Sequence, residues 1–234
     1  MSPELELISS RSCSSDQQAW WAAKGIRLRG YSLLKVNQLP FPLPEVAAES
    51  LVVFTSQHAI RALWNKAGIR PLDFLRERTI AAIAPATSGL LNQQDAPPQL
   101  TAPHAQALAE HIVHTQEPQA VRYFCKPTRR PELPKILTKA GFQVQETYVY
   151  ETQAQPQPIN WGDAAGMIFY SPSAVETYLR TNPWPSGKLA FSIGPRTAQT
   201  LKQAGITDVI TAAHPTPDSL LAVIQFACTN SKTK

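Results

Sequence analysis

Four hydroxyl side chains stand where a predicted strand gives way to a predicted helix: Ser56, Thr87, Ser171 and Thr197. The first turn of a helix has free N–H groups and the positive end of the helix dipole, and both favour anions. Hydroxyls at these four turns could therefore help to bind several carboxylates. The alternative is local, because Ser and Thr are also preferred N-caps for reasons unrelated to any ligand.

Other catalytic chemistry has little support in the sequence. His111 and His114 form an i, i+3 pair, but no third metal ligand follows at a recognised spacing, so a polar helix face is favoured over a metal site. The three cysteines, Cys13, Cys125 and Cys228, are widely spaced and form no CxxC motif. This spacing favours neither zinc nor a disulfide framework and is typical of a reducing cytosol. Glycine-rich nucleotide loops and Ser-His-Asp arrangements are also missing from the sequence.

The elements that position the four turns are repeated. Phe54-Thr55-Ser56 recurs roughly 115 residues later as Phe169-Tyr170-Ser171. Ile83-Ala84-Pro85-Ala86-Thr87 recurs at a similar interval as Ile193-Gly194-Pro195-Arg196-Thr197, and the segment 7–34 aligns with 123–150. Two homologous halves predict two similar domains with a ligand cleft between them. Recurrence of the hydroxyls and of Pro85 and Pro195 favours binding over capping for the set.

Strands alternate with helices at short spacing in both halves, which predicts an α/β fold with a doubly wound parallel sheet in each domain. Proline clusters mark the loops. We expect strands at 5–9, 51–54, 79–83, 121–125, 166–170 and 189–193, long extended segments at 26–36 and 142–152, and helices at 16–24, 56–64, after 87, 132–140, 174–180 and 197–204. Each half contains two strand-and-helix units, and periodicity does not tell whether the units of one half pack with each other or with those of the other half.

The amino-acid composition is typical of a soluble globular protein. The 234 residues are 43% apolar, and 22 Lys and Arg against 17 Asp and Glu give a net charge of +5. The basic residues are scattered without interleaved aromatics, so an acidic small molecule is favoured over nucleic acid as the partner. No stretch reaches the ~18 apolar residues of a membrane span, and no export signal is visible. We therefore expect a cytoplasmic protein with no membrane partner.

Together these motifs resemble the uroporphyrinogen-III synthase family over essentially the whole chain. The resemblance is carried by Phe54-Thr55-Ser56, by Gly141-Phe142-x-Val144 leading into Val149-Tyr150-Glu151-Thr152, by Phe169 to Val175, by Ile193-Gly194-Pro195-x-Thr197-Ala198, and by Pro215-Thr216-Pro217.

The resemblance implies two flavodoxin-like domains joined by a two-strand connector. Domain 1 would be discontinuous, 1–34 plus 153–234, and domain 2 would span 38–146, with connectors near 31–37 and 146–153. The family cyclises hydroxymethylbilane, a linear tetrapyrrole with eight carboxylates, to uroporphyrinogen III, inverting the last ring and losing water. The family precedent is a monomer that needs no metal or organic cofactor.

The resemblance also implies roles for particular side chains. Arg11 and Arg130 lie near strand-to-helix turns where the family often has a basic residue, and a guanidinium can bind a carboxylate with two hydrogen bonds. Tyr150, in the connector, is the candidate catalytic residue, because its phenol could donate a hydrogen bond to the departing hydroxyl. Strand alternation would place Tyr148 on the same face. For Arg130 a solvated helix face, and for Tyr150 a half-buried strand position, are the non-catalytic alternatives.

Departures from the family pattern leave a second function open. The turn after strand 121–125 usually contains glycine and acidic residues, whereas here it reads Lys126-Pro127-Thr128-Arg129-Arg130-Pro131. His104 stands where the second copy has Thr216, and Ala84 replaces the glycine seen at Gly194. The alternative function is a non-catalytic two-domain binder of anionic tetrapyrroles or other acidic small molecules.

Overall fold

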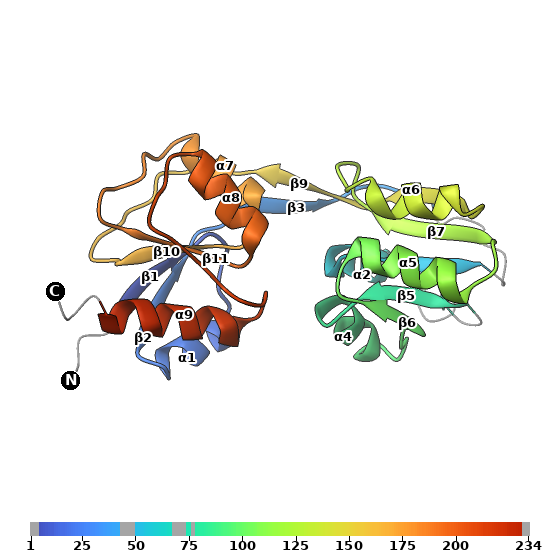
Figure 1. Cartoon of the computed structure of the whole chain (residues 1–234), viewed down its shortest axis with the longest axis horizontal. Coiled ribbons are helices and arrows are strands. Elements are labelled where there is room, and N and C mark those ends of the chain that lie inside the picture. The colour runs from blue at the N-terminus through green and yellow to red at the C-terminus, as the bar shows by residue number, and fades with distance from the viewer. Residues whose placement is uncertain (1–4, 43–49, 67–73, 76–77, 231–234) are drawn as a thin grey trace. The chain divides into compact units, whose positions relative to one another are not determined.

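A computed structural model of the chain describes residues 5–42, 50–66, 74–75 and 78–230. It divides into two compact units (Figure 1). Unit 1 contains residues 1–35 and 153–234, and unit 2 contains 36–152. The chain therefore starts and ends in unit 1 and passes through unit 2 in between.

Unit 1 is built on a five-stranded parallel sheet in the order β12-β11-β10-β1-β2. The central strand β10 (Gly166–Phe169) is a continuous buried run because helices cover both faces of the sheet. Helices α7 and α8 pack on one face and α1 and α9 on the other. The elements are β1 (Leu5–Ser9), α1 (Ser15–Ala22), β2 (Ile26–Gly30), β10 (Gly166–Phe169), α7 (Pro172–Leu179), β11 (Leu189–Ser192), α8 (Pro195–Gln203), β12 (Val209–Thr211) and α9 (Pro217–Asn230).

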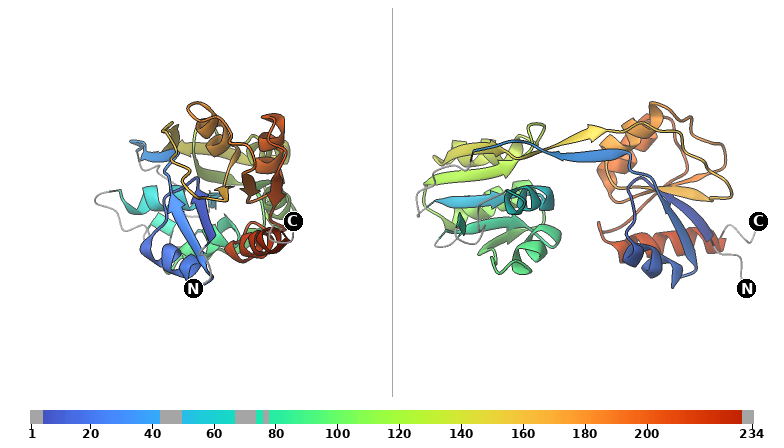
Figure 2. Two further views of the ribbon diagram at one scale, coloured as in Figure 1. Left: turned by 90° about the vertical axis from the view of Figure 1, so that its left-hand side faces the viewer. Right: turned by 180° about the vertical axis from the view of Figure 1, so that it is seen from behind.

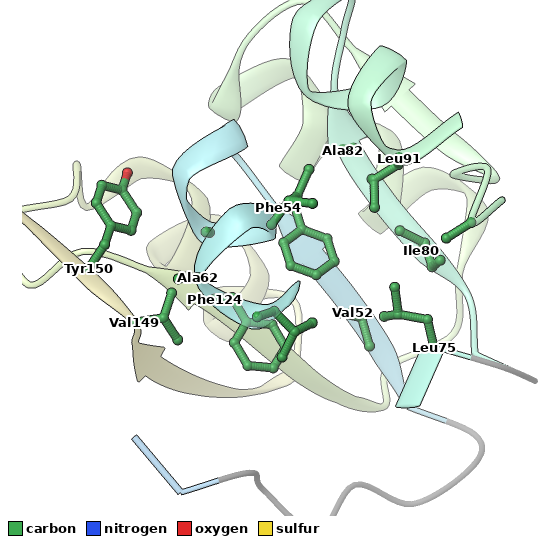
Figure 3. Packing of buried hydrophobic residues seen from close by; sticks show 14 of the residues in the cluster. Val52, Phe54, Ala62, Leu75, Ile80, Ala82, Leu91, Phe124, Val149 and Tyr150 are labelled. Carbon is green, nitrogen blue, oxygen red and sulfur yellow. The ribbon is translucent and has the colours of Figure 1, made fainter. Parts of the chain in front are cut away.

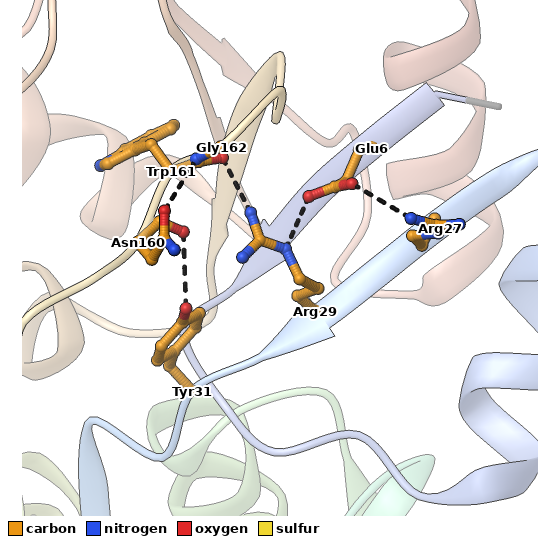
Figure 4. Close-up of polar contacts among 7 residues, drawn as sticks. All are labelled: Glu6, Arg27, Arg29, Tyr31, Asn160, Trp161 and Gly162. Carbon is orange, nitrogen blue, oxygen red and sulfur yellow. Dashed lines mark hydrogen bonds and ion pairs between the residues drawn. The ribbon is translucent and has the colours of Figure 1, made fainter. Parts of the chain in front are cut away.

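Polar contacts hold the segment before β10 against the edge strand β2 (Figure 4). The Glu6 carboxylate pairs with Arg29 at 2.6 Å and with Arg27 at 3.6 Å. Arg29 also donates to the Trp161 carbonyl at 2.8 Å, and the Tyr31 hydroxyl donates to the Asn160 carbonyl at 3.4 Å. These bonds fix the path by which the chain re-enters the sheet of unit 1.

Unit 2 repeats this design with the strand order β6-β5-β4-β7-β8, all parallel. Helices α2 and α4 cover one face and α5 and α6 the other, as the views in Figure 2 also show. The elements are β4 (Leu51–Phe54), α2 (Gln57–Trp64), β5 (Ile80–Ile83), α4 (Ala86–Asn92), β6 (Leu100–Ala102), α5 (Ala105–Thr115), β7 (Ala120–Cys125), α6 (Glu132–Lys139) and β8 (Gln143–Tyr148).

The core of unit 2 under α2 ends at Tyr150 (Figure 3). Phe54 and Phe124 stack at its centre with ring centroids 5.5 Å apart. Val149 is completely buried and Tyr150 is 6% exposed. Figure 3 shows Tyr150 at the margin of the cluster with its hydroxyl pointing away from the other side chains. The ring is therefore fixed by packing while the polar atom is left for other contacts.

The fold class predicted from the sequence, two doubly wound parallel α/β domains, is confirmed. Numbered along the chain, the strands of unit 1 have the order 2-1-3-4-5 of flavodoxin. The strands of unit 2 have the same spatial arrangement. Numbered along the chain, however, their order is 3-2-1-4-5, because the chain enters this unit at β4. The strand order reverses between β1 and β10 in unit 1 and between β4 and β7 in unit 2. Such switch points are where open α/β sheets bind ligands, just beyond the carboxyl ends of the strands.

Each extended segment expected to be one long strand is in fact two strands. The first divides into β2 and β3 (Leu34–Gln38), and the second into β8 and β9 (Tyr150–Ala154). The division follows a change of partner, since β2 and β8 belong to the five-stranded sheets while β3 and β9 pair with each other. The β3-β9 pair forms the covalent connection between the units.

Candidate functional site

A pocket of about 370 Å³ lies at the switch point of unit 2. Residues following β4 form one side, those following β7 form another, and the start of α5 completes it. Its lining is Thr55, Ser56, Ile83, Pro103, His104, Ala105, Tyr123, Cys125, Lys126, Arg129, Arg130 and Tyr150. Hydroxyls and cations therefore meet in one concave site.

Tyr150 enters this pocket as a neutral hydrogen-bond donor. Burial raises the pKa of its phenol, and a hydrogen bond with Ser56 partly opposes that shift. The ring also lies 5.5 Å from that of His58, centroid to centroid. A raised pKa keeps the phenol protonated at neutral pH, so Tyr150 can donate a hydrogen bond or a proton to a bound ligand.

The inner wall of the pocket also stays uncharged. The Tyr123 and Thr55 hydroxyls are hydrogen-bonded at 2.9 Å, and burial raises the pKa of Tyr123. Burial likewise raises the pKa of the Cys125 thiol to about 12, with a smaller contribution from the negative charge of Glu146. Cys125 is therefore a protonated, unreactive thiol at neutral pH.

The positive side of the pocket is the turn from Lys126 to Arg130, directly after β7. The Arg129 N–H donates to the Lys126 carbonyl at 3.1 Å, which closes a tight turn with Pro127 at its second position. Arg129 Nε donates to Glu146 Oε1 at 2.9 Å, and the other carboxylate oxygen accepts from the Tyr148 hydroxyl at 2.9 Å. Arg129 is thus neutralised inside the protein.

Three of the predicted site residues, Ser56, Arg130 and Tyr150, meet in the unit 2 pocket. Ser56 is also the N-cap of α2, where its hydroxyl accepts from the His58 N–H at 3.2 Å. Tyr148 does not share a face with Tyr150 as alternation predicted. It is 43% exposed, because the strand changes partner at Val149 between them.

Thr87 and Thr197 do not present outward-facing hydroxyls, so this part of the prediction is wrong. Their helices begin earlier than expected, at Ala86 and Pro195, which places both threonines inside the first turn. They are 5% and 3% exposed. Neither lines the unit 2 or the unit 1 switch-point pocket.

Unit 1 has a pocket of about 300 Å³ at its own switch point. It is lined by Arg11, Asp16, Gln17, Trp20, Trp21, Tyr170, Pro217 and Asp218. The Arg11 guanidinium lies 3.7 Å from the centre of the Tyr170 ring. Burial raises the pKa of Tyr170, and the charge of Arg11 opposes the shift. Arg11 therefore lines this pocket, where its guanidinium stacks on an aromatic ring.

Ser171 caps α7 and lies outside the unit 1 pocket. Its hydroxyl accepts from the Ala174 N–H at 3.2 Å. The local explanation weighed from the sequence, an N-cap, thus describes the contact that Ser171 makes.

Sequence reasoning missed several residues of the unit 2 pocket, notably Thr55, Tyr123, His104 and Lys126. His104 acts as the N-cap of α5, with Nδ1 accepting from the Ala107 N–H at 3.1 Å. A signal for Lys126 was present in the sequence, because it directly follows a strand of the repeated unit, in the same turn as Arg130.

Within residues 5–42, 50–66, 74–75 and 78–230, no three His, Cys, Asp or Glu side chains are grouped to hold a metal ion. Over the same described residues, no helix is both long and apolar enough to cross a membrane.

The fold and pockets define a duplicated α/β protein with one switch-point pocket in each of two permuted flavodoxin-like units. The sequence profile of the family described as "Uroporphyrinogen-III synthase HemD" matches residues 25–222. The chain belongs to the uroporphyrinogen-III synthase family. A search of curated proteins gave no significant match.

Solved structures of uroporphyrinogen-III synthases from two bacteria share the fold. Uroporphyrinogen-III synthetase from Helicobacter pylori 26695 superposes with a TM-score of 0.73 at 18% identity, covering 95% of this chain and 99% of that one. A mutant uroporphyrinogen III synthase from the extremely thermophilic bacterium Thermus thermophilus gives 0.64 at 14% identity, covering 98% of this chain and 100% of that one. At these identities the likeness concerns the fold.

Proposed function

We propose that this chain is a lyase that converts hydroxymethylbilane to uroporphyrinogen III with loss of water and inversion of the last pyrrole ring. Besides membership of the family, one observation on the unit 2 pocket supports the proposal. Tyr150, a buried phenol that stays protonated, lines the same pocket as a hydroxyl and two cations without counterions in the described part of the chain. The pocket thus combines a proton donor with groups suited to a polycarboxylate.

The proposed chemistry begins with departure of the terminal hydroxyl. As the carbon–oxygen bond breaks, the pyrrole nitrogen supplies electrons and gives up its N–H proton, while the oxygen takes up one proton and leaves as water, so that one water is lost in all. Tyr150 donates a hydrogen bond to that oxygen, which stabilises the charge that develops on it. The resulting azafulvene is attacked by the substituted carbon of the far ring. The spiro intermediate then fragments and recloses in the inverted orientation.

Substrate orientation is proposed to come from the switch-point turns. In unit 2, Ser56 and Arg130 would contact substrate carboxylates through their side chains. In unit 1, Arg11 and Ser171 remain candidates for further carboxylates. At Thr87 and Thr197 only the backbone N–H groups of the turns are proposed to contact carboxylates, because the side chains are buried.

The proposal includes no metal or organic cofactor, because the family resemblance implies none. It describes a cytoplasmic monomer acting on a small polycarboxylate tetrapyrrole, without nucleic acid or a membrane as partner.

The decisive experiment adds hydroxymethylbilane to the purified protein and identifies the isomer after oxidation to the porphyrin. We expect the type III isomer, formed well above the spontaneous rate. Only the type I isomer at the spontaneous rate would contradict the enzyme. If the protein then still bound uroporphyrin III tightly, the non-catalytic binder would be the better description.

A further inference from the structure

Two cations in the unit 2 pocket have no counterion among the residues that the structure describes. Lys126, Arg129 and Arg130 follow β7 within five residues and all line the pocket. Arg129 is paired with Glu146. Over the described part of the chain, Lys126 and Arg130 have no ion-pair partner. The sequence places all three cations in one short turn, Lys126-Pro127-Thr128-Arg129-Arg130-Pro131, which contains no acidic residue.

The positions of Lys126 and Arg130 are electrostatically unfavourable for the charged lysine. Lys126 is partly buried, and burial lowers the pKa of its ammonium group, with a further lowering from the charge of Arg130. Both effects mean that the charged lysine is destabilised where it stands. An anion placed between Lys126 and Arg130 would remove the repulsion and restore favourable interactions for both.

The turn is also held in shape by contacts within the protein. Pro127 restricts the second position of the turn, and Pro131 stands at the N-cap of α6. The Arg129–Glu146–Tyr148 contacts anchor the middle of the turn to β8. A preorganised site loses less conformational entropy on binding.

Taking the proposed function as given, we propose that Lys126 and Arg130 form a carboxylate clamp that binds the two carboxylates of one pyrrole ring of the substrate. Eight carboxylates on four rings give two per ring, which matches two cations. Arg129 is a positioning residue in this scheme, because its guanidinium is already paired with Glu146. The clamp would hold one ring of the flexible chain in the pocket that contains Tyr150.

Lys126→Gln tests the clamp by removing one charge at nearly constant length. A clamp that binds substrate and transition state equally predicts about a tenfold rise in KM with kcat unchanged. Lys126→Arg should restore KM to within about threefold of the wild type, because it replaces the charge. Lys135→Gln is the matched control: it removes the same charge from the exposed face of neighbouring α6, outside the pocket, and should leave KM unchanged.

Binding of stable porphyrins provides a readout independent of turnover. Lys126→Gln should weaken binding of uroporphyrin III, with two carboxylates per ring, about tenfold. The effect should fall to about threefold for coproporphyrin III, with one per ring, because Arg130 alone can then serve each ring. Thermal melting of the three variants would verify that they remain folded.

Equal KM and Kd values for Lys126→Gln and Lys135→Gln would overturn the clamp, and so would a loss confined to kcat. Neither result affects the proposed function as long as the wild type makes the type III isomer. If the wild type makes only type I, the proposed function fails instead, and the porphyrin comparison still decides whether Lys126 binds carboxylates.

Discussion

The two switch-point pockets occupy equivalent places in the repeated units and have opposite chemistry. In unit 1, Arg11 stacks on Tyr170, and the carboxylates of Asp16 and Asp218 line the same pocket. In unit 2, Lys126 and Arg130 line the pocket together with several hydroxyls, and neither has a counterion among the described residues. We therefore expect the unit 2 pocket to attract a polycarboxylate. In the unit 1 pocket, the one cation of the described lining is stacked on an aromatic ring and two negative charges lie beside it.

The difference shows what the duplication retained and what it changed. Both units keep the strand arrangement and a capping serine after the equivalent strand, Ser56 in unit 2 and Ser171 in unit 1. The turns after β1 and β7 differ in charge and in the residues that they contact. Packing restrains the sheet, whereas turns at the strand ends are free to change with function.

Replacing Tyr150 by Phe should produce the largest effect. The substitution removes the only titratable donor that the connector contributes to the unit 2 pocket lining and keeps the ring packed beside His58. Turnover should fall ~100-fold, as expected for a positioned acid, while uroporphyrin III binding is nearly unchanged. Steady-state kinetics with isomer analysis would measure this.

Tyr148→Phe is the control for that experiment. Tyr148 loses the same atom two residues away, but its hydroxyl donates to Glu146 and lies outside the pocket lining. Its turnover should stay within about twofold of the wild type. Normal turnover in Tyr150→Phe beside a slow Tyr148→Phe would assign the catalytic role to the other tyrosine.

The arginines of the two pockets allow a direct comparison of charge. Arg130→Gln should weaken uroporphyrin III binding about tenfold, the effect of losing a hydrogen bond to a charged group. Arg11→Gln should weaken it about threefold or less, because the guanidinium is stacked on Tyr170 beside two carboxylates. Titrations at fixed salt would measure both. A larger effect at Arg11 would contradict the assignment of the charged subsite to unit 2.

The fold was predictable because the repeat and the apolar runs are local signals. The strands at 5–9 and 51–54 agree with the structure to the residue. The short strands β6 and β12 and the helix α9 were not predicted, and α5 was anticipated only as the polar helix face that contains His111 and His114. β6 has only three residues and a partly exposed pattern, so it forms mainly because β5 pairs with it.

The site was less predictable because it depends on contacts distant in sequence. Ser56, Arg130 and Tyr150 share a pocket only once β4, β7 and the connector lie side by side. The pairing of Arg129 with Glu146, which leaves Lys126 and Arg130 as the unpaired cations of the described pocket, requires the register of β7 on β8. Thr87 and Thr197 are buried because their helices begin a residue or two earlier than predicted. The exact first residue of a helix is the feature that a sequence pattern defines least well.

The capping serines provide the mildest test of the difference between the two units. Ser→Ala removes a single hydroxyl at equivalent positions. Ser56→Ala and Ser171→Ala each remove an N-cap and should each reduce the stability of their unit by ~1 kcal/mol. Only Ser56→Ala should also weaken uroporphyrin III binding, because Ser56 alone of the two lines a switch-point pocket. Urea unfolding can separate the units: circular dichroism follows both, whereas tryptophan fluorescence reports mainly unit 1, which contains four of the five tryptophans. Ser171→Ala should therefore shift the fluorescence transition, and Ser56→Ala should shift the circular dichroism with little change in fluorescence.

An equal loss of porphyrin affinity in the two variants would mean that the unit 1 turn binds carboxylates as well, and the contrast between the units would then be one of degree.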